Sequence, residues 1–231
     1  MRHTGIRRPS TLETLTTRGW LSHGRHALGV VTWLLLFVGQ PLFVQSQTEA
    51  MENKESLSSI ALGAGCFWCV EAVFEQLEGV QSAVSGYMGG HIKNPGYREV
   101  CTGRTGHAEV VLITFDEAQI ALGDILEVFF ATHDPTTLNR QGADVGTQYR
   151  SAIFYASEEQ KAMADAALQK AQLGFDVGIV TEITPATVFY EAEDYHQAYY
   201  ELNGEAPYCR AVIAPKMQKF RKQFEPLLKV H

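Results

Sequence analysis

The order of apolar periodicities between residues 58 and 174 constrains the fold more than any other feature of the sequence. Alternating or β-branched runs predict strands over residues 58–62, 80–87, 107–115 and 149–155. Helical spacing predicts helices over residues 67–78, 120–132 and 157–174. The order strand, helix, strand, strand, helix, strand is that of a ferredoxin-like split βαβ core. We therefore predict an α+β fold, a two-layer sandwich in one domain, with further elements after the core.

Residues 1–46 differ from the rest of the chain in charge. They hold five of the 19 basic residues and one of the 26 acidic ones, which leaves 14 basic and 25 acidic residues on the remainder. An apolar run over residues 28–38 has the length of a signal-peptide core, whereas Gln40 and Pro41 interrupt a longer span. We expect either a cleaved export signal ending near Ser46 or an N-terminal membrane anchor. Either one would place the body outside the cytosol, in the periplasm or the extracellular space.

The remaining boundaries follow from polarity. Residues 47–57 are polar enough for a linker, so we place the folded domain at residues 58–224 and a C-terminal tail at residues 225–231. The acidic body has no cluster of five Lys or Arg residues, which makes it a poor electrostatic partner for nucleic acid. We expect a monomer that binds no nucleic acid and that contacts a membrane only through the leader.

The chemistry concentrates where the first predicted strand meets the first predicted helix, at the sequence GCFWC over residues 65–69. Cys66 would lie at the helix start, where free backbone N–H groups and the helix dipole favour a thiolate, the nucleophilic form. Cys69 would lie one turn later on the same side, near enough to act as a second thiol. Gly65 would let the backbone turn tightly beneath the first thiol.

Other uses of the cysteines stay open from the residues alone; the four are Cys66, Cys69, Cys101 and Cys209. Export would permit a structural disulfide. A zinc site would need a second close pair, which the chain lacks. A third alternative is a thioredoxin-like dithiol. Such proteins also have a CxxC motif at a helix start, and Thr184-Pro185 would correspond to their proline loop. However, the predicted order of strands and helices is not that of thioredoxin.

Five motifs in the same order resemble the peptide methionine sulfoxide reductase A family. They are GCFWC at 65–69, the glycine-rich region over 86–110, HDP at 133–135, residues 141–153, and AEDYHQ at 192–197. The likeness spans about residues 58–224, nearly all of the predicted body. It implies a thiol-dependent reductase of methionine S-sulfoxide, in proteins and as the free amino acid. It also implies that no metal or organic cofactor is bound.

Glu109 is the expected proton donor for the released oxygen. In the strand over 107–115, Glu109 lies on the same face as Val111, Ile113 and Phe115, because alternate residues point to one side. An acid is therefore expected on an apolar face. Burial disfavours the ionised form, and a neutral carboxyl can donate a proton. The alternative is an exposed carboxylate at the end of the strand.

The resemblance implies hydrogen-bonding roles for three further polar residues. Tyr97 and Tyr149 would donate to the sulfoxide oxygen and stabilise the charge that develops on it. Asp144 would help to set this network. Without the resemblance, each tyrosine would more often be an ordinary packing residue.

The same likeness implies an aromatic substrate pocket. Phe67 and Trp68, beside Gly65, would accept the methyl group of the substrate, and His196 falls in a matching segment with a substrate-binding role. From the residues alone, core packing at helical spacing would be the simpler explanation.

The implied cycle has three steps, and the second is where this chain departs from the common pattern. Cys66 attacks the sulfoxide and becomes a sulfenic acid, a second thiol forms a disulfide, and an external thioredoxin-like dithiol restores the enzyme. Many members have glycine after GCFW and two cysteines in a glycine-rich tail, whereas this chain has Cys69 and one late cysteine, Cys209. We expect Cys69 or Cys209 to resolve, alone or in relay, and Cys101 to be a structural thiol.

Two other functions fit parts of the pattern. One is an exported protein that binds oxidised methionine without reducing it, which the combination of thiol, acid and two tyrosines disfavours. The other is a general thiol–disulfide oxidoreductase, which would reduce insulin disulfides and ignore sulfoxides.

Overall fold

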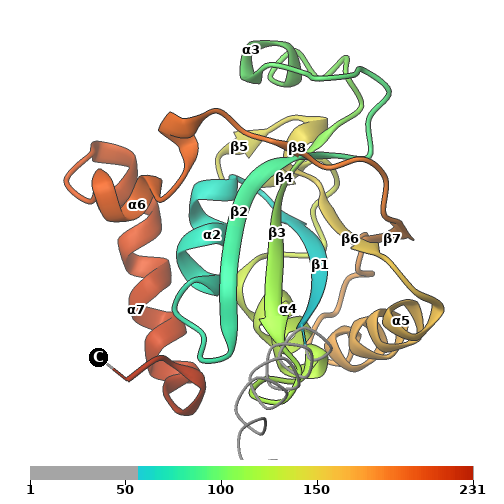
Figure 1. The fold of residues 1–231 in the computed structure, drawn as a ribbon, viewed down its shortest axis with the longest axis vertical. Helices are drawn as coiled ribbons and strands as arrows, with labels where there is room; N and C mark the ends of the chain where they lie inside the picture. Colours follow the sequence, from blue (N-terminus) through green and yellow to red (C-terminus); the bar gives the residue numbers. More distant parts are fainter. Residues whose placement is uncertain (1–56, 231) are drawn as a thin grey trace, which may run out of the picture. The chain divides into compact units, whose positions relative to one another are not determined.

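The computed structural model describes residues 57–230, and its sheet has the predicted split βαβ core (Figure 1). The core strands are β1 (Leu57–Ala64), β2 (Val80–Met88), β3 (Ala108–Asp116) and β6 (Ser151–Tyr155), and the core helices are α2 (Phe67–Phe74) and α4 (Leu122–Thr132). Their order in the sheet is β6-β1-β3-β2, with every neighbouring pair antiparallel. The predicted α+β class with a ferredoxin-like core is confirmed.

Additional elements widen this core. Helix α5 (Glu158–Gln172) leads to β7 (Glu182–Pro185), which lies parallel to β6 at one edge, and β8 (Tyr190–Glu191) lies antiparallel to β2 at the other. The shorter elements are α3 (Tyr97–Val100), the hairpin of β4 (Arg140–Gln141) and β5 (Asp144–Val145), and α6 (Tyr199–Leu202), followed by α7 (Ala214–Gln223). The predicted cap of α5 is present, because the Gln160 backbone N–H donates to Ser157 Oγ at 3.2 Å.

The two faces of the sheet bury different side chains. Ile60 and Leu62 of β1 join the main core with the apolar residues of α2 and α4, whereas Ala61 between them joins a smaller cluster on the other face. Figure 1 shows α2 lying along β2 and β3, with α6 and α7 beyond it. The N-terminal end of α2 is therefore held against the middle of the sheet.

Among the element boundaries that differ from the prediction, two have a clear structural cause. Helix α2 ends at Phe74 rather than at residue 78, because the next residues turn to meet the end of the chain, where the Glu78 N–H donates to Leu227 O at 2.8 Å. The fourth core strand begins at Ser151, because Thr147–Tyr149 forms a 3₁₀ turn. This turn takes Tyr149 out of the sheet and to the cavity described below.

The structure differs from the prediction at the C-terminal end of the domain. Backbone pairing continues beyond residue 224, since the Lys229 N–H donates to Gln76 O at 2.9 Å. The predicted leader over 1–46 and nearly all of the linker over 47–57 lie outside the described residues. Over residues 57–230, no helix is both long and apolar enough to cross a bilayer.

Candidate active site

A cavity of about 210 Å³ at the start of α2 gathers the residues singled out from the sequence. It is lined by Cys66, Phe67, Trp68, Tyr97, Glu109, Asp144, Tyr149 and Tyr208. Seven of these eight were predicted as site residues, and Tyr208 was not. They come from the start of α2, from β3, and from three other segments, which hold Tyr97, Asp144 with Tyr149, and Tyr208.

Gly65 makes the turn that presents Cys66. Its φ is +92°, in the left-handed region that favours glycine, and a Cβ built on it would lie 2.6 Å from Gln141 Cβ. Cys66 follows as the N-cap of α2, with its carbonyl accepting from the Cys69 N–H at 3.0 Å. The Cys66 side chain is 9% exposed, so substrate reaches the thiol through the cavity alone.

Glu109 is buried as the strand parity predicted. Its side chain is 2% exposed, and its Oε2 accepts a hydrogen bond from the Phe67 backbone N–H at 3.1 Å. Burial raises the pKa of Glu109 to about 8, while the hydrogen bond from Phe67 opposes this shift. The carboxyl is therefore mostly protonated at neutral pH and can donate a proton into the cavity.

The electrostatics of the two thiols differ from the prediction. A hydrogen bond with Cys69 is the largest cause that raises the pKa of Cys66, followed by burial and by the charge of Glu109. The expectation that the helix start holds Cys66 as a thiolate is therefore wrong for the substrate-free protein. The hydrogen bond with Cys69, burial and the charge of Glu109 outweigh the helix start, which gives the Cys66 side chain no capping hydrogen bond.

Cys69 shifts in the opposite direction. The hydrogen bond with Cys66 lowers the pKa of Cys69 to about 7, and the positive charge of Lys216 contributes to the same shift. The first proton of the pair therefore leaves near neutral pH, and it leaves Cys69 in preference to Cys66. The neighbouring thiol is thus the more acidic one.

Tyr97 and Tyr149 enter the cavity from separate loops. Tyr97 begins α3, and its backbone N–H donates to Glu193 Oε1 at 2.9 Å; Tyr149 ends the 3₁₀ turn before β6. Burial raises the pKa of both phenols, so both hydroxyls keep their protons and can donate. Glu193 was not singled out from the sequence, although the AEDYHQ motif contains it.

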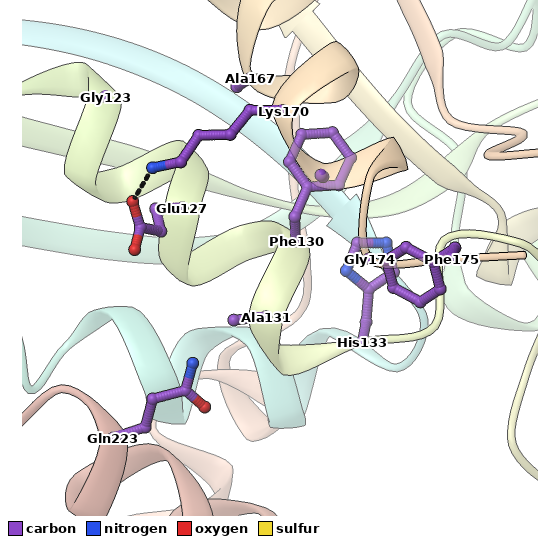
Figure 2. A pocket seen from close by; sticks show the side chains of 11 residues that line it. Gly123, Glu127, Phe130, Ala131, His133, Ala167, Lys170, Gly174, Phe175 and Gln223 are labelled. Atoms are coloured by element: carbon purple, nitrogen blue, oxygen red, sulfur yellow. Dashed lines mark hydrogen bonds and ion pairs between the residues drawn. The ribbon is translucent and has the colours of Figure 1, made fainter.

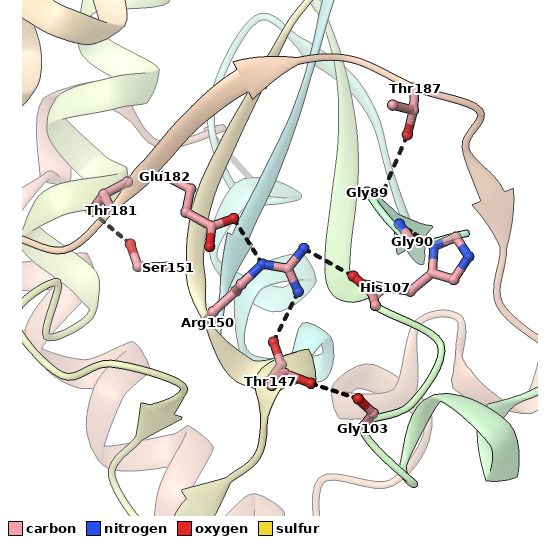
Figure 3. A network of polar contacts seen from close by, with 11 residues as sticks. Gly89, Gly90, Gly103, His107, Thr147, Arg150, Ser151, Thr181, Glu182 and Thr187 are labelled. Carbon is pink, nitrogen blue, oxygen red and sulfur yellow. Dashed lines mark hydrogen bonds and ion pairs between the residues drawn. The ribbon is translucent and has the colours of Figure 1, made fainter. Parts of the chain in front are cut away.

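Arg150 fixes the turn that carries Tyr149 (Figure 3). Its Nη1 donates to Thr147 O at 3.0 Å, its Nη2 donates to Gly106 O at 3.1 Å, and its Nε pairs with Glu182 at 2.9 Å. The side chain is only 11% exposed, so these donors are largely shielded from water. One side chain thereby ties the turn of Tyr149 to the loop that leads into β3, the strand of Glu109.

Phe67 and Trp68 form the aromatic wall, and His196 lies behind it. Trp68 stacks on Tyr199 with ring centroids 3.6 Å apart, and its Nε1 donates to His196 Nδ1 at 3.0 Å. His196 is 1% exposed and does not line the cavity. The substrate-binding role of His196 stays a prediction, and its ring packs behind the cavity beside Phe67 and Tyr97, with centroids 5.0 and 4.5 Å away. Its contacts are those of a residue that holds Trp68.

A buried carboxyl on α2 holds the segment that packs against this wall. Glu71 accepts from Ser85 Oγ at 2.8 Å and from the Ala198 backbone N–H at 2.9 Å. Ala198 has a φ of +49°, a strained value for a residue with a Cβ. The bond to Glu71 offsets this strain and places Tyr199 on Trp68.

Asp144 and Tyr208 form a separate hydrogen-bonded pair. The Tyr208 hydroxyl donates to Asp144 Oδ2 at 2.8 Å and lies 3.9 Å from Cys69 Sγ. Within residues 57–230, the Asp144 side chain thus bonds to Tyr208 and not to Tyr97 or Tyr149. From the sequence, the one indication that Tyr208 belongs to the site was that it directly precedes Cys209.

All four cysteines are free thiols. Cys209 has no exposed surface and starts a π-helical turn, Cys209–Ile213, that runs into α7. Burial is the largest cause that raises the pKa of Cys209, and the negative charge of Cys69 is the second. This electrostatic interaction indicates that the two thiols lie near each other. Cys101 is exposed and does not line the cavity, and it shares a hydrogen bond with the Tyr97 side chain. In the described part of the chain, no group of three or more His, Cys, Asp or Glu residues is arranged to hold a metal ion.

A larger cavity of about 550 Å³ between α4 and α5 holds no comparable chemistry (Figure 2). Its histidine, His133, is bonded at both ring nitrogens, to Phe129 O at 2.7 Å and to Ser151 Oγ at 2.8 Å. Burial lowers the pKa of His133 to about 4, so the ring is neutral. The Lys170–Glu127 ion pair at this cavity is exposed. The reactive groups are therefore at the start of α2.

The second thiol one turn from Cys66 defines the class of protein. Two thiols can supply two electrons by forming a disulfide, and the protonated Glu109 can supply a proton to a small group bound in the cavity. Fold and site together define a thiol-dependent oxidoreductase.

Comparison with known proteins gives the family. A family model described as peptide methionine sulfoxide reductase matches residues 58–227. The peptide methionine sulfoxide reductase MsrA of Acinetobacter baumannii is 58% identical over 167 residues, 72% of this chain and 96% of the relative. That of Saccharolobus solfataricus is 55% identical over 170 residues, 74% of this chain and 96% of the relative. A crystal structure of Mxr1 from Saccharomyces cerevisiae in reduced form has a TM-score of 0.63 at 32% identity, covering 67% of this chain and 90% of that chain.

The chain belongs to the peptide methionine sulfoxide reductase family, as the five motifs predicted. It is an oxidoreductase acting on sulfur groups, and its reaction is the thiol-dependent reduction of methionine sulfoxide.

The geometry of the first turn leads to a prediction. Gly65→Ala combines backbone strain with a collision against the Gln141 side chain, whereas Gly142→Ala has φ +60° and nothing within 4 Å of the new Cβ. We expect Gly142→Ala to lower the free energy of unfolding by about 1 kcal/mol and Gly65→Ala by about 2–4 kcal/mol, with a loss of activity for Gly65→Ala alone. Urea denaturation measures the difference; equal losses would contradict the role of the Gln141 contact.

Proposed function

We propose that the chain reduces the S epimer of methionine sulfoxide, in proteins and as the free amino acid, with Cys66 as nucleophile. The observation that carries this assignment is the meeting of Cys66, protonated Glu109 and two tyrosine hydroxyls in one small cavity. A sulfoxide needs a nucleophile for its sulfur and proton donors for its oxygen, and the cavity supplies both. The reaction requires no metal or organic cofactor, because the two electrons come from thiols.

In the first step, Glu109, Tyr97 and Tyr149 donate hydrogen bonds to the sulfoxide oxygen and polarise the S–O bond. The sulfur becomes more positive, which stabilises a thiolate at Cys66 and offsets the raised pKa of that thiol in the empty site. The Cys66 thiolate then attacks the sulfoxide sulfur, and Glu109 protonates the oxygen. The oxygen passes to the Cys66 sulfur as its bond to the methionine sulfur and the bond between the two sulfurs break, so methionine leaves and Cys66 remains as a sulfenic acid.

The substrate methyl group fits the aromatic wall. Phe67 and Trp68 line the cavity beside Cys66. His196 and Tyr199 hold the indole ring in place. A fixed wall on one side and hydrogen-bond donors on the other give a chiral sulfur one productive orientation.

Cys69 is the favoured first resolving residue. It shares a hydrogen bond with Cys66, and the pKa of its thiol is about 7, near the value at which a thiol attacks fastest in neutral solution. Its sulfur attacks the sulfenic sulfur, forms the Cys66–Cys69 disulfide and expels water. Cys209, buried near Cys69, then attacks Cys69 in relay and frees Cys66.

An external dithiol completes the cycle. A thioredoxin-like protein reduces the final disulfide by thiol–disulfide exchange, and oxidised proteins are the other partners. We also propose export or outward anchoring through the leader, supported by its basic stretch and apolar run. N-terminal sequencing of the mature chain distinguishes a cleaved leader from an anchor.

The epimer specificity gives the central prediction. With dithiothreitol as reductant, the chain should consume the S epimer of a methionine sulfoxide peptide and leave the R epimer, and Cys66→Ser should lose all turnover. Chiral chromatography of the remaining sulfoxide measures this. Reduction of insulin disulfides without sulfoxide turnover would instead favour a general oxidoreductase.

The raised pKa of Glu109 gives a second prediction. The proton donor is present below about pH 8 and is lost as pH rises through that value, so kcat/KM should fall on the alkaline side. Glu109→Gln cannot donate a proton and should lose about 10²–10⁴-fold in the rate of methionine release, together with this alkaline decline. Glu159→Gln, at an exposed carboxyl on α5, is the matched control and should change neither.

The order of the thiols gives a third prediction. After one turnover without reductant, mass spectrometry should find Cys69 disulfide-bonded in the wild type, and Cys69→Ser should accumulate the Cys66 sulfenic acid. Cys101→Ser should behave as the wild type. A full cycle in the Cys69→Ser/Cys209→Ser double variant would refute both resolving assignments.

A further inference from the structure

The proposed reduction of the sulfoxide assigns no role to Tyr208. Its hydroxyl lies 2.8 Å from Asp144 Oδ2 and 3.9 Å from Cys69 Sγ, and it also shares a hydrogen bond with Cys66. The ring is held by an edge contact with Trp68, with centroids 5.9 Å apart and planes at 74°. The hydroxyl is therefore fixed beside the thiol that we assign to the second step, and it also lines the cavity that holds Cys66.

The Tyr208 hydroxyl has a single hydrogen, and this fixes the direction of its hydrogen bonds. At 2.8 Å that hydrogen points to the Asp144 carboxylate. The lone pairs of the same oxygen are then free to accept the S–H of Cys69. The result is a chain of donors from Cys69 through Tyr208 to Asp144, ending in the cavity.

We propose that Tyr208 and Asp144 form the proton relay that serves Cys69 when it resolves the Cys66 sulfenic acid. This inference rests on the proposed function, and it assigns Asp144 to the second step rather than to the binding of the sulfoxide oxygen. Tyr208 touches the reacting sulfur and is a catalytic residue, whereas Asp144 acts through it.

The step balances without an outside reagent. The Cys69 sulfur bonds to the Cys66 sulfur, and the S–O bond of the sulfenic acid breaks. The Cys69 proton passes to the Tyr208 oxygen as the Tyr208 proton passes to Asp144, and Asp144 returns a proton through the cavity to the departing hydroxide, which leaves as water. The Cys69 sulfur is oxidised and the Cys66 sulfur is reduced, so the electrons also balance.

Glu109 is less well placed for this role. Its Oε2 is held by the Phe67 N–H at the start of the helix, and it gives up its proton in the first step. Tyr208, in contrast, contacts Cys69 directly. The relay also belongs to this chain in particular, because it requires the cysteine at position 69, where many relatives have glycine.

The test separates the two steps in the full-length reduced chain. In a Cys209→Ser background, one equivalent of a methionine S-sulfoxide peptide is added without reductant. Quenched samples report methionine release, Cys66–Cys69 disulfide formation, and Cys66 sulfenic acid trapped with dimedone. Tyr208→Phe removes only the hydroxyl, and Tyr155→Phe, at a half-buried tyrosine on β6, is the matched control.

We expect Tyr208→Phe to release methionine within about threefold of the background rate but to form the disulfide at least tenfold more slowly, with dimedone adduct accumulating on Cys66. Asp144→Asn should show the same pattern, and Tyr155→Phe should show neither change. Added imidazole buffer should restore part of the disulfide rate in Tyr208→Phe, which a merely structural defect would not allow.

Two outcomes overturn the proposal. The proton relay is refuted if Tyr208→Phe forms the disulfide at the background rate. If Tyr208→Phe fails to fold, the same result in Asp144→Asn refutes it. Neither result bears on the proposed reductase function. An equal fall in methionine release and disulfide formation would place Tyr208 in the first step instead. Absence of methionine release from the wild-type chain would refute the proposed function itself.

Discussion

The hydrogen bond from the Phe67 N–H to Glu109 is the interaction on which the site depends. It joins the start of α2 to β3 and directs the first free donor of the helix to an acid, leaving the adjacent thiol without it. The acid therefore stays within reach of the cavity although it is buried and mostly protonated. In the proposed mechanism the bound sulfoxide activates the Cys66 thiol. The contact therefore fixes the proton donor beside the nucleophile.

Around this contact the site divides into two halves with separate supports. Arg150 secures the oxygen side by holding the turn of Tyr149. Glu71 secures the methyl side by holding the segment that packs on Trp68. Each support is a side chain largely shielded from water that binds backbone atoms, so each fixes a loop rather than a single neighbouring residue.

The sequence was sufficient for everything that depends on local periodicity. Strand order in the core and the burial of Glu109 follow from alternation along the chain, and the ordered motifs gave the family. The early end of α2 could not be predicted, because it depends on Leu227 at the far end of the chain. The thiol pKa values were missed because they depend on the hydrogen bond between Cys66 and Cys69, on burial, and on charges from distant positions such as Glu109 and Lys216.

The small cavity also decides which oxidised residues are repaired. Only a side chain can enter a space of about 210 Å³ whose thiol is 9% exposed, so the polypeptide that carries it must stay outside. A sulfoxide packed inside a folded client is out of reach until that region opens. Repair by this chain is therefore coupled to the local unfolding of its clients, and damage is removed first where a client is already loosened.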